Sequence, residues 1–533
     1  MLEPKAVQLV AGSAVLGLLL ATGAAALAGP WDSGQRTAER VRASARPVTG
    51  GADHGPGAPG SGPGDRTDGA SGDRTDGASG DREDGASGDR RPGPAAVPSP
   101  APSAAAVLAA LRPAPAAPSG KPEPGTSGRT PAPGERPAAG KPPAGLAALL
   151  DPLLADPALG PRHTAVVVDA VTGKELYGKG AADPMTPAST AKLATAAAAL
   201  GALGPDHRIP TTVVAAPDGR SVTLVGGGDP TLDRPRLTAL ARDTARALRA
   251  RKITGVRLSY DTSRYRGPER HPIGPNENLA PISPLMTDEG RLDGSAAGPA
   301  PRSDDPAGDT ARSFAALLTE AGVRTEGPPA HAGAPRRATT LASTLSAPLS
   351  ALVERALTES DNDLAEALAR ATVLAAGRPA ALTATDAAVR GRLAGLGLPL
   401  AGTRFGDGSG LDRGDRVSAR LLAGLLARAA DPRHPELRPI LTGLPVGGFT
   451  GTLKDRYSSP AAGAGLIRAK TGTLTGVNAL AGTVVGAGGR LLAFAFLADG
   501  TDSPDAAQAA LDRLAAALAP AAASAPSPPA ASD

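Results

Sequence analysis

Three short motifs place serine, lysine and asparagine side chains at spacings that suit acyl transfer. Ser189 and Lys192 form a Ser-x-x-Lys motif, and none of the other eight lysines among the 533 residues has a serine three positions earlier. Positions three apart lie on one face of a helix, so the amine can reach the hydroxyl. A serine becomes a good nucleophile when a base removes its proton, and a lysine with a depressed pKa can be that base. The pair alone also fits a chance serine and lysine in the first turns of a helix.

A second motif, Ser360-Asp361-Asn362, carries one of only four asparagines in the chain. A serine hydroxyl beside an asparagine amide can relay a proton and hold a substrate amide. An ordinary helix cap or turn uses the same residue types, because short polar side chains satisfy free backbone N–H groups there.

The third motif, Lys470-Thr471-Gly472-Thr473, ends an apolar stretch that begins near Leu466. A lysine ammonium and a threonine hydroxyl can together bind a substrate carboxylate. Gly472 leaves room for an extended ligand to lie against the strand edge as an added strand. An exposed strand end with a turn-forming glycine would show the same pattern.

The residues around these motifs predict helices and antiparallel strands. We expect a strand over His163–Ala170, a return strand over Glu175–Gly178, and a helix over Pro187–Leu200 that carries the first motif. The other predicted elements are helices over Pro348–Ala376, Ser418–Ala430 and Pro504–Leu518, and strands over Thr211–Ala215, Ser221–Val225, Leu466–Thr473, Val477–Val485 and Arg490–Ala498. Hairpins with helices at both ends of the chain indicate an α/β (α+β) fold, in which an antiparallel sheet is flanked by helices.

All three motifs occur once and in this order, and together they resemble the serine penicillin-recognising enzymes, in which such motifs line one cleft. Ser189 and Ser360 are 171 positions apart, which is longer than in the compact β-lactamase layout, whereas Asn362 and Lys470 are 108 apart. The resemblance therefore implies a β-lactamase/transpeptidase-like domain with a large β-rich insertion, at about residues 211–340, between the first two motifs.

Stretches in the insertion and in the later part of the chain resemble one group among these enzymes, the low-molecular-mass class C penicillin-binding proteins. These are the D-alanyl-D-alanine carboxypeptidase/endopeptidases of peptidase family S13. The matching stretches are Val225–Leu232, Tyr260–Tyr265, Asp407–Leu411, Leu444–Gly448, Gly451–Leu453 and Ala479–Gly482. Asp412, where serine is expected, and the Asp499-Gly500 pair, where asparagine is common, depart from the family pattern.

The resemblance implies a serine-type D-Ala-D-Ala carboxypeptidase. Ser189 would attack the carbonyl of the penultimate D-Ala of a peptidoglycan stem peptide, with Lys192 as base and the backbone N–H groups of Ser189 and Thr473 holding the oxyanion. Water would then cleave the acyl-enzyme, and β-lactams would acylate the same serine and persist. The remaining roles implied are proton transfer to the leaving amine by Ser360, Asn362 and Lys470, and substrate binding by Lys470, Thr471, Gly472 and Thr473.

Two other functions fit the motifs. A serine β-lactamase would need a general base for deacylation, and the only glutamates between the second and third motifs are Glu366 and Glu436. Glu436 lacks the surrounding pattern expected of such a loop. A non-hydrolysing penicillin-binding sensor or scaffold would keep the fold, although intact Ser189 and Lys192 argue against it.

Composition excludes several kinds of site. The absence of cysteine excludes thiolate metal sites and disulfides, and the six histidines are scattered singly without ligand spacing. We therefore expect no metal and no cofactor, and most of the histidines on the surface or in loops. The 56 basic and 52 acidic residues leave a net charge of only +4, and no basic run has interleaved aromatics, so we expect no nucleic-acid partner.

Composition also divides the chain. Residues 29–145 are rich in proline, glycine and serine, with three tandem octads at 65–88, and are predicted as a disordered spacer because their few apolar side chains cannot offset the entropy of ordering. A similar tail covers residues 519–533. The penicillin-binding catalytic domain is therefore expected over residues 146–518.

The first 28 residues predict export. Ala6–Ala28 is an apolar run that follows Lys5 and is interrupted only by three polar residues. It suits a cleaved signal peptide, and it is also long enough to remain as a membrane anchor. Either outcome places the protein in the cell envelope, secreted to the cell wall or anchored at the outer face of the cytoplasmic membrane, with peptidoglycan stem peptides and β-lactam inhibitors as the implied partners.

Overall fold

The computed structural model describes residues 145–457, 463–486 and 489–519. The predicted export segment, the predicted spacer up to residue 144 and the tail from residue 520 lie outside these residues. Within the described part of the chain, no helix combines the length and the apolarity needed to cross a bilayer.

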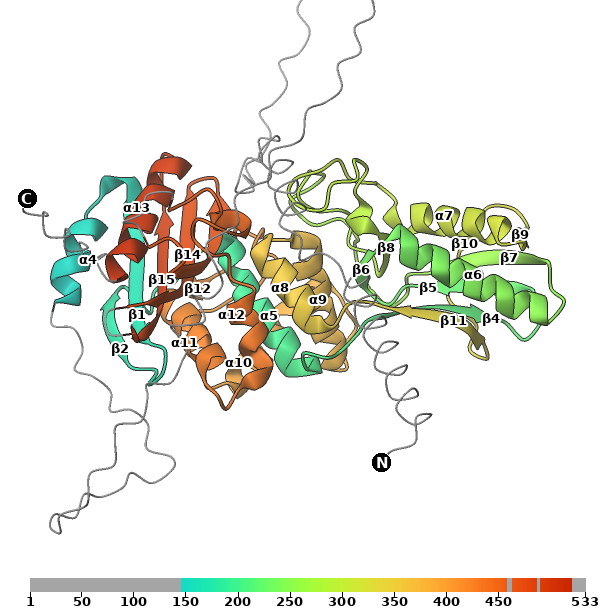
Figure 1. Ribbon diagram of the computed structural model, residues 1–533, viewed down its shortest axis with the longest axis horizontal. Helices are drawn as coiled ribbons and strands as arrows, with labels where there is room; N and C mark the ends of the chain where they lie inside the picture. Colours follow the sequence, from blue (N-terminus) through green and yellow to red (C-terminus); the bar gives the residue numbers. More distant parts are fainter. Residues whose placement is uncertain (1–144, 458–462, 487–488, 520–533) are drawn as a thin grey trace, which may run out of the picture. The chain divides into compact units, whose positions relative to one another are not determined.

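A five-stranded antiparallel sheet, the main sheet, joins the first and the last strands of the described chain (Figure 1). Its strand order is β13-β14-β15-β1-β2. The strands are β1 (Arg162–Asp169), β2 (Glu175–Lys179), β13 (Ile467–Leu474), β14 (Val477–Val485) and β15 (Leu491–Asp499). The predicted antiparallel sheet is therefore confirmed, and β13, which carries the third motif, forms one of its edges.

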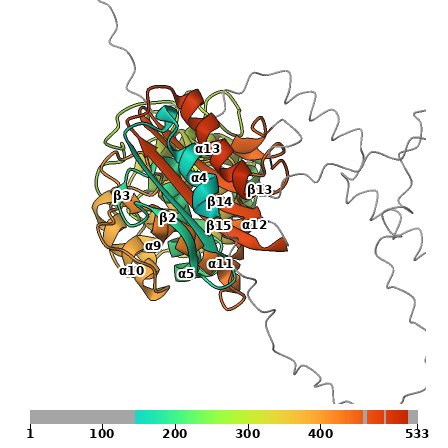
Figure 2. The same cartoon turned by 90° about the vertical axis from the view of Figure 1, so that its left-hand side faces the viewer.

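Helices cover both faces of the main sheet, and successive strand residues are buried on opposite sides. Val167 and Phe494 pack in the core beneath α4 (Leu146–Leu154) and α13 (Pro504–Leu518). Val166 and Ala495 belong to the core on the other face, beneath α11 (Ala419–Ala430) (Figure 2). Burial on both faces explains why these strands read as continuous apolar runs rather than as alternating patterns.

The helix α5 (Ala191–Leu203) lies at the centre of the helical layer and follows directly on the turn that carries Ser189. Every residue from Ala191 to Leu200 is buried, as expected of a helix that is apolar all round. Its neighbours are α8 (Leu349–Thr358), α9 (Asn362–Ala375), α10 (Thr385–Gly395), α11 and α12 (Arg438–Thr442). The many alanines of α5 let these helices pack close to the turn that carries Ser189.

Two helix predictions need correction. The pattern over Pro348–Ala376 forms two helices, α8 and α9, because Ser360 between them has a φ of 57°, in the left-handed region. Asp361 then caps α9, since its carboxylate accepts the Leu364 N–H at 3.0 Å. The helix predicted over Pro187–Leu200 begins as the 3₁₀ turn η2 (Ala188–Thr190), and α5 continues to Leu203.

A second sheet, the inserted sheet, lies between the first two motifs in the sequence. Its order is β10-β7-β5-β4-β11, with β9 also paired to β7. The strands are β4 (Pro210–Ala215), β5 (Ser221–Val225), β7 (Gly255–Asp261), β9 (Arg324–Thr325), β10 (Ala330–His331) and β11 (Thr339–Leu345). The predicted β4–β5 hairpin is confirmed, whereas β5 and β7 are parallel because α6 (Arg234–Ala250) connects them as a crossover.

The inserted sheet has its own core beneath α6 and α7 (Pro306–Glu320), which lie on one face of it (Figure 1). Leu240 and Phe314 are almost completely buried there. The remaining short elements are η1 (Pro157–Leu159), β3 (Pro184–Met185), β6 (Asp229–Leu232), β8 (Leu285–Thr287), η3 (Asp288–Gly290), η4 (Leu382–Ala384), β12 (Val417–Ser418), η5 (Pro435–Leu437) and η6 (Gly451–Leu453).

Candidate active site

Ser189 lies in η2, wedged between the edge of the main sheet and the loop 407–412. Ala188 has a φ of 47°, so the turn is held in a conformation that a residue with a Cβ rarely adopts. Gly472 of β13 makes this approach possible: a Cβ there would lie 2.7 Å from the Pro187 carbonyl oxygen. The glycine of the third motif therefore admits the backbone of the Ser189 turn.

Lys192 is buried in the first turn of α5, with only 1 % of its surface exposed. Its Nζ donates hydrogen bonds to Ser189 Oγ at 2.9 Å, to Asn362 Oδ1 at 2.7 Å and to the Ser409 carbonyl at 2.8 Å. Burial lowers the pKa of Lys192 to about 8, although nearby carboxylates, led by Asp407, oppose the shift. An amine with this pKa is partly neutral near pH 7 and can accept the serine proton.

The turn between α8 and α9 presents both residues of the second motif. Asn362, the first residue of α9, accepts the Lys192 hydrogen bond, and its Nδ2 donates to the Asn278 carbonyl at 3.0 Å. Asn278 belongs to the long segment between β7 and β8, so the inserted part of the chain directly orients this amide. The left-handed φ of Ser360 turns its hydroxyl toward Lys470, whose Nζ lies 2.9 Å from Ser360 Oγ.

Lys470 brings a second buried ammonium to the site. Besides its bond to Ser360, its Nζ donates to the Thr471 carbonyl at 2.9 Å. Burial, together with the positive charge of Lys192, lowers the pKa of Lys470 well below its usual value. The Thr471 hydroxyl donates to Thr452 Oγ1 at 2.8 Å, which ties the third motif to η6.

Among the described strands, none pairs with the outer edge of β13, and this free edge supplies backbone groups to the same place. The Ala469 N–H donates to the Pro445 carbonyl at 2.9 Å, so this residue turns its backbone groups away from β14. Backbone direction alternates along an antiparallel strand, and Thr471 and Thr473 therefore direct theirs to the same edge. The segment at Pro445 pairs with the N-terminal half of β13, at Ala469. Thr473 lies in the C-terminal half of the strand, next to the Ser189 turn.

A cavity of about 470 Å³ opens beside these groups. It is bounded by the second motif, the end of β13, the segment after β8 and the segment that follows η6. Its charged lining residues are Arg291, Arg302, Glu359, Asp361, Lys454, Asp455 and Arg456, and Thr452, Thr471 and Thr473 also face it. The cavity can therefore take a polar ligand that carries a carboxylate.

The structure thus brings all three motifs together: Ser189, Lys192 and Asn362 are directly linked, and Ser360 and Lys470 form an adjacent pair. Sequence reasoning assigned no role to the Ser409 carbonyl or to Thr452, although both lie in stretches that matched the family pattern. Asn278 had no sequence signal at all, because it acts through its backbone carbonyl.

An antiparallel sheet flanked by helices, with a serine–lysine pair facing Ser-x-Asn and Lys-Thr-Gly, defines a serine penicillin-recognising enzyme. The model of the D-Ala-D-Ala carboxypeptidase 3 (S13) family matches residues 146–301 and 293–518. The chain belongs to this family.

Relatives and solved structures agree with this membership. The chain is 39% identical over 391 residues to the carboxypeptidase DacB of Mycolicibacterium smegmatis, covering 70% of this chain and 84% of the relative. It is 31% identical over 440 residues to the D-alanyl-D-alanine carboxypeptidase of Actinomadura sp. (strain R39), covering 67% and 81%. The crystal structure of penicillin binding protein 4 (dacB) from Haemophilus influenzae shares the fold, with a TM-score of 0.58 at 21% identity over 69% of this chain and 97% of that one.

Proposed function

We propose that this protein is a serine DD-carboxypeptidase/DD-endopeptidase that cleaves D-Ala-D-Ala bonds of peptidoglycan stem peptides. The observation that carries the proposal is the buried Lys192, which contacts both Ser189 and Asn362 and has a pKa of about 8. Such a lysine can take the serine proton without help from a histidine.

Acylation follows from this geometry. Neutral Lys192 takes the proton from Ser189 Oγ as the oxygen attacks the carbonyl carbon of the penultimate D-Ala. The backbone N–H groups of Ser189 and Thr473 receive the developing oxyanion, an arrangement worth about 3 kcal/mol for each donor. Thr473 suits this role because its backbone faces the free edge of β13.

Release of the leaving amine uses the pair formed by Ser360 and Lys470. Lys470 donates to Ser360 Oγ, so the Ser360 hydroxyl is placed to pass a proton to the departing amine. The Lys470 amine, with Thr473, which lines the cavity, is placed to bind the terminal carboxylate. The proton that Lys192 took from Ser189 replaces the one that Ser360 gave to the amine, which leaves Lys192 neutral again. Water then attacks the ester on Ser189, and Lys192 accepts a proton from the water and passes it to the Ser189 oxygen as the acyl group leaves. A β-lactam forms the same ester but keeps its leaving group attached, so it blocks the site.

The positions of two glutamates favour this activity over that of a β-lactamase. Glu366 is fully buried and accepts the backbone N–H groups of Gly408 and Ser409, so it cannot activate water in the cavity. Glu436 lies in η5, pairs with His434 at 3.1 Å and is not among the residues that line the cavity.

The size of the cavity supports the endopeptidase half of the proposal. A volume of about 470 Å³ exceeds the need of a single departing alanine and leaves room for the longer leaving group of a peptide cross-link. Because such substrates lie outside the cytoplasm, we also propose that the apolar segment Ala6–Ala28 directs export.

Labelling with a fluorescent penicillin, beside the Ser189→Ala variant, tests the assignment of the nucleophile. We expect a covalent label on the native protein and none on the variant, and equal labelling of both would refute it. Release of D-Ala from diacetyl-Lys-D-Ala-D-Ala then separates an enzyme from a sensor that is acylated without turnover. Cleavage of a purified cross-linked muropeptide dimer tests the endopeptidase activity.

A further inference from the structure

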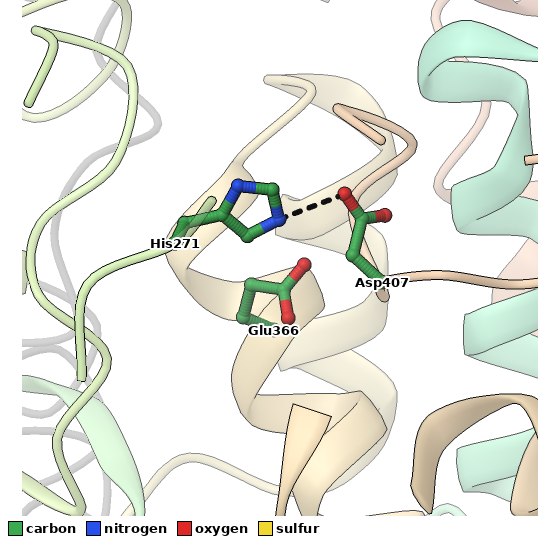
Figure 3. A group of neighbouring side chains, drawn as sticks. All are labelled: His271, Glu366 and Asp407. Carbon is green, nitrogen blue, oxygen red and sulfur yellow. Dashed lines mark hydrogen bonds and ion pairs between the residues drawn. The ribbon is translucent and has the colours of Figure 1, made fainter. Parts of the chain in front are cut away.

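A second cluster of buried titratable groups lies behind Lys192 and has no role in the mechanism above. It consists of His271, Glu366 and Asp407, which converge from three distant segments (Figure 3). His271 lies in the inserted part of the chain between β7 and β8, Glu366 lies on α9, and Asp407 begins the loop that reaches Lys192. His271 lies in a loop, as expected of most histidines here, but it is buried, with only 6 % of its surface exposed.

Asp407 organises the loop that contacts Lys192. Its Oδ1 accepts the N–H groups of Ser409 at 3.0 Å and Gly410 at 2.6 Å. Its Oδ2 accepts the Asp412 N–H at 2.7 Å and lies 3.0 Å from His271 Nε2. With two donors on each oxygen, the Asp407 carboxylate has its acceptor capacity filled, so it supports the loop and keeps no lone pair for a cation.

Glu366 holds the same loop from the other side. Its Oε1 accepts the N–H groups of Gly408 at 2.9 Å and Ser409 at 3.0 Å, and Arg370 lies 3.6 Å from its Oε2. The two carboxylates thus hold the Ser409 N–H, and Asp407 also holds the Gly410 N–H, so the backbone is fixed on both sides of the Ser409 carbonyl, which accepts the hydrogen bond from Lys192 at 2.8 Å.

His271 is the contribution of the inserted part of the chain to this network. The Ile273 N–H points to its Nδ1 at 3.3 Å, which makes Nδ1 an acceptor. The ring proton therefore resides on Nε2 and is donated to Asp407, an assignment that follows from the hydrogen bonds. The charged groups that face the ring are the carboxylates of Asp407, Glu366 and Asp412.

We propose that His271 is a positioning residue for Lys192 and acts through Asp407 and the Ser409 carbonyl. The inserted part of the chain thereby helps to hold Lys192, the base, in place beside the catalytic serine. This inference rests on the proposed function, in which Lys192 is that base. The link runs His271 Nε2 to Asp407 Oδ2, Asp407 Oδ1 to the Ser409 N–H, and the Ser409 carbonyl to Lys192 Nζ.

The electrostatic consequence has a definite sign. Burial lowers the pKa of Lys192, while the carboxylates of Asp407, Asp361, Glu366 and Asp363 raise it, Asp407 most strongly among them. When the hydrogen bond from His271 Nε2 is removed, the negative charge of Asp407 loses one of its four donors. This charge then interacts more strongly with the Lys192 ammonium. The pKa of Lys192 then rises, and acylation needs a higher pH.

The test compares His271→Leu with His271→Gln in the full-length protein, through the second-order rate of acylation by a fluorescent penicillin between pH 6 and 10. Leucine removes the donor at similar volume, and we expect the midpoint of the pH profile to rise by at least about half a unit, which costs about threefold or more in rate at pH 7. The Gln amide can reach Asp407 in place of Nε2, so His271→Gln should recover most of the rate and the native midpoint. The matched control is His434→Leu, which removes a histidine paired with Glu436 away from the site and should leave the midpoint unchanged.

A native midpoint in His271→Leu would overturn the proposal, whatever happens to thermal stability. A His271→Gln midpoint shifted as far as that of His271→Leu would also overturn it. The hydrogen-bond donor to Asp407 would then not be what sets the midpoint of the pH profile. If His271→Leu does not fold, His271→Asn replaces it, since its shorter amide stays near the position of Nδ1 and does not reach Asp407. Failure of the proposed function is distinct: the native protein would then show no Ser189-dependent acylation at all.

Discussion

Replacement of Lys192 by methionine tests the central claim about catalysis. Methionine has a similar length but no proton acceptor, so acylation of Ser189 should fall by about 10²–10⁴-fold, the usual contribution of a general base. The loss of the Nζ donor leaves Asn362 Oδ1 and the Ser409 carbonyl without that partner, at a cost of about 1–3 kcal/mol each. Removal of a fully buried ammonium offsets part of this cost, so the variant should remain folded.

The native pH profile gives the second half of the same prediction. With a pKa of about 8, about one tenth of Lys192 is neutral at pH 7 and about nine tenths at pH 9, so acylation should rise about tenfold between these values. Stopped-flow acylation at low penicillin concentration reports this pKa, because it reflects the free enzyme. Lys174→Met, in the exposed turn between β1 and β2, is the matched control. Acylation of Lys192→Met within tenfold of the native rate, or a flat native profile, would refute the assignment of the base.

Three further predictions concern the nucleophile, the edge strand and the inserted sheet. Ser189→Ala should abolish labelling and leave the thermal midpoint within about 2 °C of the native value, because the lost hydroxyl makes one hydrogen bond; a larger loss would give the serine a structural role. Gly472→Ala should slow acylation more than about tenfold and destabilise the protein by about 1–3 kcal/mol, since its Cβ would displace the Pro187 carbonyl, and unchanged acylation would contradict the packing described for the Ser189 turn. Phe314→Ala should cost about 3–5 kcal/mol of unfolding free energy in denaturant titration, and a cost below about 1 kcal/mol would mean that the core beneath α6 and α7 is not tightly packed.

The sequence predicted most of the features that depend on neighbouring residues, namely single strands, one hairpin and the three motifs. The strands around the third motif and the hairpin β4–β5 followed from apolar runs and turn residues, and the motifs stood out because lysine and asparagine are rare. The separation of α8 from α9 was missed, because the helical pattern runs through Ser360 and only its left-handed φ breaks it. That conformation serves the contact with Lys470 and has no signal in residue type.

The rest depends on contacts between distant parts of the chain. His271 and Asp407 are 136 positions apart, and nothing around either residue indicates the other. The same holds for Asn278, whose backbone carbonyl orients Asn362. Composition does predict that α5 can be fully buried, yet it cannot say which helices surround it.

The edge of β13 has a consequence for the behaviour of the protein in solution. An unpaired strand edge is a template on which another chain can add, and it therefore favours aggregation. Here the segment at Pro445 already occupies the first half of the edge, and the Ser189 turn lies against Gly472 in the second half. These contacts, made by described residues, shorten the stretch of β13 on which another sheet could add, so they discourage self-association at the strand that borders the site.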